Sequence, residues 1–332
     1  GCAAGGVPGQ KDRAVCQYRA EYPGRRSALR DEECTEGIEI GVLFIGRGEN
    51  MPKIVIALGG NALQSKDSKP TAEGQLEVVR QTCERLAEIS AQGYEMSIVH
   101  GNGPQVGRIL LASEAAKDLT PAMPFDVCGA MSQGYIGYHI QQALKYALSI
   151  RNKHCPVVTV ATQMVVDRDD RAFENPAKPI GPFYTEEEAK KLEEENGYTM
   201  KEDAGRGWRR VVASPIPRKI VEIEAIKNLW KSTIVISCGG GGIPVVENPD
   251  GTLEGVAAVI DKDHAAELLA EQVEADILMI LTEVEKAAVN WGRPNQKNLD
   301  TMSLKEAAQY VEEGQFAPGS MLPKVEACMK FV

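Results

Sequence analysis

The sequence lacks a long apolar run, and positive charge is in short supply. No uncharged apolar stretch reaches the roughly 18 residues that a membrane helix needs, so we expect no bilayer-spanning segment. The 37 Lys and Arg residues are outnumbered by 47 Asp and Glu residues, which gives a net charge of −10. An acidic chain argues against a broad nucleic-acid surface. We therefore expect neither a membrane nor a nucleic acid as partner.

Paired cysteines and histidine clusters are also missing. The eight cysteines include no C-x-x-C pair, which indicates neither a disulfide framework nor a zinc site and favours a reducing cytoplasm. We interpret Cys83, Cys128 and Cys238 as buried small apolar residues. No His, Cys or carboxylate cluster accompanies His100 or His264, so structural roles are favoured for both and no protein-held metal site is predicted.

Several nucleotide-binding signatures are absent. No Gly-Lys dipeptide occurs, which excludes a P-loop, and neither protein-kinase signatures nor a G-x-S-x-G elbow are found. Gly101, Gly103 and Gly107 follow a predicted strand and open a helix, as a dinucleotide loop would. Their spacing differs from G-x-G-x-x-G, and no acidic residue closes a following strand about 20 residues on. Dinucleotide binding is therefore disfavoured.

Glycine-rich loops follow three predicted buried strands. Residues 54–58, 96–100 and 233–237 are apolar runs of the kind found in strands buried on both faces. Loops at the carboxyl ends of parallel strands meet in one crevice, and glycine exposes backbone N–H groups that can hold an anion. We favour a phosphate site over mere tight packing. The loop residues are Gly59, Gly60 and Asn61, then Gly101, Asn102 and Gly103, then Gly239, Gly240, Gly241 and Gly242.

Strand and helix patterns alternate along most of the chain, which predicts an α/β fold with a mainly parallel sheet and helices on both faces. The predicted helices cover residues 71–92, 129–150, 264–273 and the stretch around 303–314, with a last one after residue 320; further strands cover 156–162 and 277–281. Between about residues 167 and 214 the alternation breaks. This segment predicts a small protruding lid with its own helix at 186–196, able to close over a substrate.

Residues 1–50 differ from the rest, because they mix glycine, arginine and glutamate with no sustained period. A clean strand pattern begins just after Met51. We expect the first 50 residues to be translated upstream sequence or disordered, with residues 51–332 forming the functional domain.

Three lysines lie in contexts that restrict the backbone. Lys262 stands between Asp261 and Asp263 at a predicted helix start, where aspartates can cap the helix. Lys324 follows the loop APGSMLP, and Lys178 lies among prolines in the predicted lid. Most lysines are solvated surface charges. Fixed cations beside glycine loops are what phosphoryl transfer requires, since it depends on positioning and charge stabilisation, so we predict an enzyme that moves a phosphoryl group.

At these residues the chain resembles the carbamate kinases of the amino acid kinase family. The resemblance runs from Met51 to Val332, and KPIGPF together with EDAGRGWR separates it from acetylglutamate and uridylate kinases. The motifs that carry it are ALGGNAL, HGNGPQVG, KPIGPF, KEDAGRGWR, SCGGGGIPVV, VIDKD and FAPGSMLPK.

The resemblance implies a three-layer α/β/α sandwich, a cytoplasmic homodimer, and a phosphotransferase with a carboxyl group as acceptor. The implied reaction is ATP + carbamate ⇌ ADP + carbamoyl phosphate with Mg²⁺. In the family's setting, arginine metabolism by the arginine deiminase pathway, the useful direction makes ATP.

The resemblance also implies a role for each site residue. Lys262 and Lys324 would contact the transferring phosphoryl group, Asp263 would hold these lysines, and Lys178 would reach the carbamoyl side. The loops named above would line the phosphoryl and carbamate pocket, with Gly239 to Gly242 beside it. The nucleotide would be held by Thr282, Glu283, Val284, Ala317, Gly319, Ser320 and Met321.

The chain departs from the family at both ends. Residues 1–50 have no counterpart, and the family continues beyond the position of Val332 with strands that complete the nucleotide half. We therefore expect exposed core surface, poor expression or weak activity. The alternatives are another small-acid kinase of the same fold, a non-catalytic binding relative, and a truncated inactive product.

Overall fold

The structure, a computed structural model, describes residues 14–17, 43–44, 52–65, 68–203 and 205–332. A five-stranded parallel sheet in the order β14-β3-β4-β11-β5 lies at its centre. The sheet strands are β3 (Lys53–Leu58), β4 (Glu95–His100), β5 (Val157–Thr159), β11 (Ile234–Ile236) and β14 (Ile277–Ile280).

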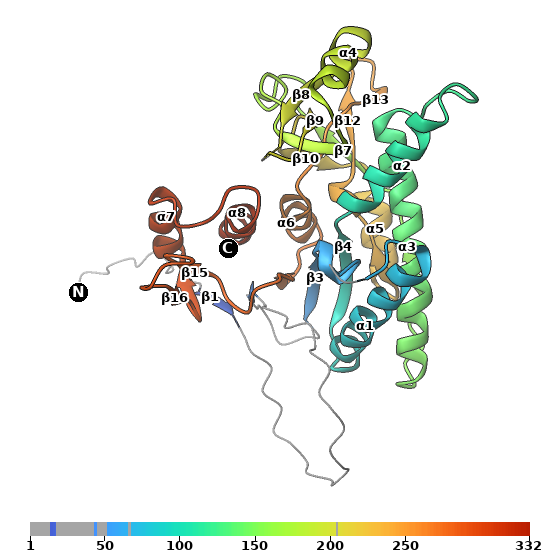
Figure 1. Ribbon diagram of the computed structural model, residues 1–332. Helices are drawn as coiled ribbons and strands as arrows, with labels where there is room; N and C mark the ends of the chain where they lie inside the picture. Colours follow the sequence, from blue (N-terminus) through green and yellow to red (C-terminus); the bar gives the residue numbers. More distant parts are fainter. Residues whose placement is uncertain (1–13, 18–42, 45–51, 66–67, 204) are drawn as a thin grey trace, which may run out of the picture.

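Alternate residues of β3 face opposite helical layers, as strand geometry requires. Ile54, Ile56 and Leu58 pack in one apolar cluster with residues of α1 (Ala72–Ala91) and α3 (Phe125–Ser149). Figure 1 shows these two helices on one side of β3 and β4, with α6 and α8 on the other.

The opposite layer is built on the intervening side chains Val55 and Ala57. They pack with residues of α5 (Ile223–Trp230), α6 (Lys262–Gln272) and α8 (Met321–Phe331). The predicted three-layer sandwich around a mainly parallel sheet is therefore confirmed.

A second sheet has the strand order β10-β6-β12-β13. β6 (Gln163–Val166) and β12 (Ile243–Glu247) are parallel, and β10 (Pro217–Ile220) and β13 (Leu253–Gly255) add antiparallel edges. The strand predicted near residues 156–162 is shorter in the structure, since β5 ends at Thr159 and the Val160 N–H makes one further bond, to the Ile236 carbonyl of β11.

The cause of this early end lies in the next hydrogen bonds. The Gln133 side chain accepts the N–H of Thr162 at 2.8 Å, and the Ile243 N–H donates to the Thr162 carbonyl, so Thr162 already belongs to the second sheet.

Residues 178–212 form a third unit. β7 (Lys178–Tyr184), β9 (Trp208–Val212) and β8 (Thr199–Glu202) make an antiparallel sheet, with α4 (Glu186–Asn196) beside it. Thr185 caps α4 in a reciprocal capping box with Glu188, and left-handed Gly197 ends it. In Figure 1 this unit projects at the top of the view. We call it the lid.

The remaining elements are short. α2 (Gly103–Ala115) follows β4, and the carboxyl-terminal third adds β15 (Ala288–Val289), β16 (Lys297–Asn298), β17 (Thr301–Ser303) and α7 (Leu304–Glu312). Within the described part of the chain, no helix combines the length and apolar character needed to cross a bilayer.

Of the first 50 residues, only two short strands are described. β1 (Ala14–Gln17) pairs antiparallel with β17 and with β2 (Leu43–Phe44). The rest of this stretch, with Met51, lies outside the described residues, so the expectation that residues 1–50 are upstream sequence or disordered stays a prediction.

The predicted burial of the cysteines is confirmed, since Cys83, Cys128 and Cys238 are fully buried. Burial raises the pKa of the Cys83 and Cys238 thiols to about 12, which keeps both protonated and inert at neutral pH. His100 is also fully buried, in agreement with a structural role.

Candidate active site

The site is organised by the first turn of α6. Asp261 is the N-cap residue, and its Oδ1 accepts the N–H of Asp263 at 3.0 Å. A side-chain oxygen at this position satisfies a backbone donor that has no partner within the helix. The predicted cap is therefore present, and it fixes the direction in which Lys262 and Asp263 leave the helix.

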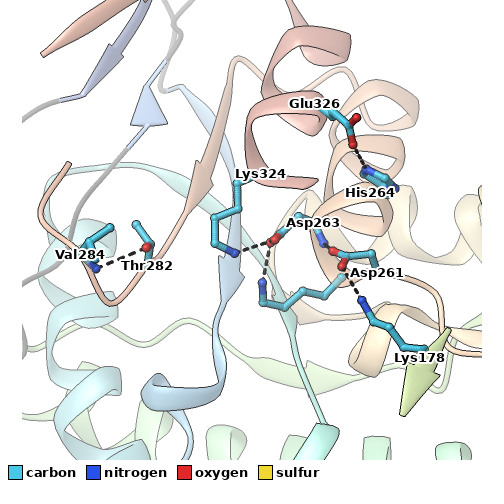
Figure 2. Close-up of polar contacts among 9 residues, drawn as sticks. Lys178, Asp261, Asp263, His264, Thr282, Val284, Lys324 and Glu326 are labelled. Atoms are coloured by element: carbon cyan, nitrogen blue, oxygen red, sulfur yellow. Dashed lines mark hydrogen bonds and ion pairs between the residues drawn. The ribbon is translucent and has the colours of Figure 1, made fainter. Parts of the chain in front are cut away.

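Asp263 holds two lysines. Its Oδ1 accepts the Lys262 ammonium at 2.6 Å, and its Oδ2 accepts the Lys324 ammonium at 2.7 Å. The Asp263 side chain is only 3% exposed, so the contact is shielded from water. Lys324 reaches it from α8, which packs against α6 (Figure 2). The tertiary packing of two helices thus brings together lysines 62 residues apart in sequence.

The environments of the two lysines differ in their electrostatic effect. Burial lowers the pKa of Lys262, with Asp263 opposing the shift and Lys324 adding to it. Burial also acts against the charged form of Lys324, but the Asp263 charge and hydrogen bonds outweigh it and raise the pKa of Lys324. Lys324 is therefore a permanently charged group, whereas Lys262 holds its proton less tightly.

Lys178 enters from the lid. Its ammonium lies 3.1 Å from Oδ2 of Asp261, the oxygen that does not cap the helix. Burial disfavours the Asp261 carboxylate, but the charges of Lys178 and Lys262 and the bond from the Asp263 N–H lower its pKa overall. Figure 2 shows Lys324 and Lys178 on opposite sides of the two aspartates. Asp261 was not among the predicted site residues, although the Asp-Lys-Asp pattern was a signal for it.

A cleft of about 1220 Å³ opens beside the lysine pair. It is lined by Lys262, Lys324, all seven residues predicted to bind the nucleotide and two of the ten predicted to bind the substrate. The other predicted residues on its wall are Gly59, Gly60, Thr282, Glu283, Val284, Ala317, Gly319, Ser320 and Met321.

The cleft wall also contains side chains that the sequence did not single out. Arg85 comes from α1, and Asn290, Trp291 and Arg293 come from the turn between β15 and β16. Trp291 is 59% exposed. No motif marked these residues, because the position of Arg85 depends on how α1 packs and that of the other three on how the turn folds beside the cleft.

The loop after β4 lies behind the lysine pair. Gly101 lies next to the Lys262 stem, since a Cβ built on it would be in van der Waals contact with the Lys262 side chain at 3.4 Å. The Asn102 amide donates to Ser132 Oγ of α3 at 2.8 Å, and Gly103 begins α2. These three residues are not on the wall of the cleft described above.

The loop after β11 is packed inside the molecule. A Cβ on Gly239 would meet the His100 ring, and one on Gly240 would overlap the Asn102 amide. A Cβ on Gly241 would overlap the backbone carbonyl of Ile260. A Cβ on Gly242 would meet the Met164 side chain. The predicted contact of this loop with a phosphoryl group stays a prediction, as does that of Asn61, whose side chain lies outside the described residues.

Comparisons with known proteins identify the family of this chain. The profile of the amino acid kinase family matches residues 52–332. A carbamate kinase of Clostridium perfringens is 60% identical over 284 residues, which cover 84% of this chain and 90% of the relative. A carbamate kinase of Pyrococcus horikoshii is 55% identical over 283 residues, with the same coverage of 84% and 90%.

A solved structure is similar as well. The carbamate kinase of Giardia lamblia bound to AMP-PNP superposes with a TM-score of 0.80 at 44% identity, covering 84% of this chain and 89% of that one. The chain therefore belongs to the amino acid kinase family and, within it, to the carbamate kinases.

Proposed function

We propose that this chain transfers a phosphoryl group reversibly between ATP and carbamate, giving ADP and carbamoyl phosphate. The observation that carries the proposal is the pair of lysine ammonium groups held on one buried carboxylate, Asp263, at the wall of a cleft. Two fixed cations beside a cleft of this size suit the charge that spreads over a moving phosphoryl group.

The residues at the site have different roles in the reaction. In the direction of ATP synthesis, the bond between the carbamate oxygen and phosphorus breaks while a β-phosphate oxygen of ADP forms a new bond to phosphorus. Lys262 and Lys324 stabilise the charge on the phosphoryl oxygens, and Asp263 keeps both ammonium groups in place. Carbamate is already an anionic nucleophile in the reverse direction, so no strong general base is needed.

The lid supplies the carbamoyl end of the site. Lys178 neutralises charge on the carbamate, and closure of the lid keeps water from carbamoyl phosphate. The nucleotide lies along Thr282 to Val284 and Ala317 to Met321, which line the cleft next to Lys324. The similar carbamate kinase of Giardia lamblia, solved with bound AMP-PNP, supports a nucleotide as substrate.

Mg²⁺ accompanies the nucleotide in this proposal. Enzymes that act on nucleotides commonly bind Mg²⁺ through phosphate oxygens plus one or two carboxylates, and the cleft wall includes Glu84 and Glu283. The ion supplies charge neutralisation of the phosphates when it is bound.

The chain acts as a homodimer through α3. This helix exposes apolar side chains at spacings of four and seven residues, namely Val127, Met131 and Tyr138, of which Met131 is 49% and Tyr138 59% exposed. A second copy would cover this stripe. Light scattering should report a dimer for the wild type and a monomer for Met131→Glu with Tyr138→Glu; a wild-type monomer would contradict the proposal.

The cellular setting follows the resemblance to carbamate kinases. We propose a cytoplasmic enzyme of arginine metabolism that works toward ATP in the arginine deiminase pathway. Free buried cysteines are compatible with a reducing compartment.

The experiment supplies ADP and Mg²⁺ with either carbamoyl phosphate or acetyl phosphate and follows ATP. Wild-type protein should form ATP from carbamoyl phosphate in strong preference, and Lys262→Ala should lose the activity. Equal or better use of acetyl phosphate would favour another small-acid kinase. A folded protein that forms no ATP from either would refute phosphoryl transfer.

A further inference from the structure

We propose that Asp261 is a positioning residue that ties the lid lysine Lys178 to the lysine pair held by Asp263. The inference rests on the proposed roles of these lysines. The proposed link between the lid and the lysine pair passes through the Asp261 carboxylate and the Asp263 N–H, and neither residue lies on the wall of the cleft.

Each oxygen of Asp261 has a separate partner. Oδ1 accepts the Asp263 N–H at 3.0 Å and caps α6, whereas Oδ2 accepts the Lys178 ammonium at 3.1 Å. Asp263 in turn binds Lys262 and Lys324 through its own two oxygens. A continuous set of polar contacts therefore runs from β7 of the lid to α8.

The balance of charge gives this arrangement a function. Three ammonium groups, those of Lys178, Lys262 and Lys324, converge on two carboxylates. One positive charge remains in excess, which suits an anionic substrate. Without Asp261, Lys178 would lose its carboxylate partner and only Asp263 would offset the charges of the three lysines, so their mutual repulsion would favour an open lid.

Burial makes the contact between Asp261 and Lys178 more than a surface ion pair. The Asp261 side chain is 16% exposed and that of Lys178 is 32% exposed. Exposed ion pairs contribute little because water and salt screen them, but a half-buried pair at a helix terminus is better able to fix a side chain. The contact thus holds Lys178 beside the first turn of α6 before the substrate arrives.

A binding site that is arranged beforehand binds its substrate more tightly than one that must first be closed. Loss of the contact should therefore raise the KM for carbamoyl phosphate, the substrate that Lys178 contacts. It should leave the KM for ADP nearly unchanged, because the proposed nucleotide residues lie at Thr282 to Val284 and Ala317 to Met321, away from the lid.

The variant Asp261→Asn separates the two roles of this side chain. The amide oxygen still caps α6, since Asn is as good an N-cap residue as Asp. The amide nitrogen is a donor and cannot accept the Lys178 ammonium. Glu254→Gln is the matched control, because it also replaces a carboxylate by an amide. Glu254 lies on β13 of the second sheet, outside the site, and forms an exposed ion pair with Arg168.

The experiment measures ATP formation from ADP and carbamoyl phosphate for wild type, Asp261→Asn, Lys178→Ala, the double variant and Glu254→Gln, with thermal unfolding of each. We expect Asp261→Asn to raise the KM for carbamoyl phosphate about tenfold, the scale of one hydrogen bond to a charged group. The KM for ADP should stay within about twofold and the unfolding temperature should be nearly unchanged.

The double variant decides whether the effect passes through Lys178. With Lys178 replaced by Ala, Asp261→Asn should add no further change to the KM. An unchanged KM in Asp261→Asn, or the same loss with and without Lys178, would overturn the inference while leaving the proposed reaction intact. A wild type that forms no ATP would overturn the proposed function and the inference with it, and this outcome is read directly from the wild-type arm.

Discussion

The glycine loops after β3 and β11 look alike in sequence but have different surroundings. Gly59 and Gly60 line the cleft, and a Cβ on Gly60 would meet no heavy atom within 4 Å. Gly239 and Gly241 are buried, and a Cβ on either would collide with a neighbouring segment. The loop after β3 therefore borders open space at Gly60. The loop after β11 needs its glycines because other segments of the chain approach it closely. A run of glycines after a strand therefore does not by itself identify a ligand-binding loop.

The largest effect should come from Gly241→Ala. Gly241 has a φ of 94°, which disfavours any residue with a Cβ, and the added methyl would overlap the Ile260 carbonyl. We expect a loss of about 4 kcal/mol in the free energy of unfolding, at the severe end for a point mutation. Urea denaturation measures it, and a loss below about 1 kcal/mol would show that this loop is not fixed by packing.

A smaller effect concerns His100, which packs against Gly239. Burial lowers the pKa of His100 to about 4, although its bond to the Gly101 carbonyl acts in the opposite direction. Below about pH 6.5 the unfolded chain therefore binds a proton at His100, whereas the folded chain binds it only below about pH 4. Stability should fall as the pH drops through this window, by about 2 kcal/mol at pH 5 from His100 alone.

The test of this pH effect is His100→Gln, which cannot titrate. Its free energy of unfolding should depend less steeply on pH between 6.5 and 4 than that of the wild type. Parallel pH profiles for the two proteins would mean that His100 is not held neutral beside the β11 loop.

The smallest effect on stability should come from Gly60→Ala. Gly60 lies outside the left-handed region and its Cβ would point into open space, so the free energy of unfolding should change by less than about 1 kcal/mol. The methyl nevertheless enters the cleft wall, and kcat/KM should fall by about tenfold because the substrate is displaced. An unchanged kcat/KM would place the substrate away from this loop and weaken the contrast between the two loops.

The sequence predicted the parts of this molecule that local patterns specify. The helix over residues 71–92 is observed as Ala72–Ala91 with Thr71 as its cap, because capping and apolar spacing are local properties. The turn residues Asn248, Pro249, Asp250 and Gly251 join the antiparallel strands β12 and β13. The helix of the lid lies at Glu186–Asn196, within the residues that broke the alternation.

The features that the sequence did not predict depend on tertiary packing. The sharing of Asp263 by Lys262 and Lys324 depends on how α6 meets α8, which no spacing along the chain reveals. Trp291 and Arg293 reach the cleft from a turn without a motif. The close packing around Gly239 to Gly242 could not be predicted either, because the sequence does not distinguish a glycine beside a ligand from a glycine beside another polypeptide segment.

The central claim is that the lysines on Asp263 act on the phosphoryl group, and a comparison of two lysines of α8 tests it most directly. Lys324 and Lys330 each bind a buried carboxylate of α6 at 2.7 Å, Asp263 and Glu267 respectively, but only Lys324 lines the cleft. Each would be replaced by Ala, and ATP formation from ADP and carbamoyl phosphate measured at a temperature at which circular dichroism shows both variants folded.

We predict that Lys324→Ala lowers kcat by about 100-fold or more, the scale for removal of one group that stabilises transition-state charge. Lys330→Ala should keep kcat close to wild type, although it leaves Glu267 without its ion-pair partner and lowers stability. Equal losses of kcat in the two variants, or near-wild-type activity in Lys324→Ala, would contradict the assignment of the site.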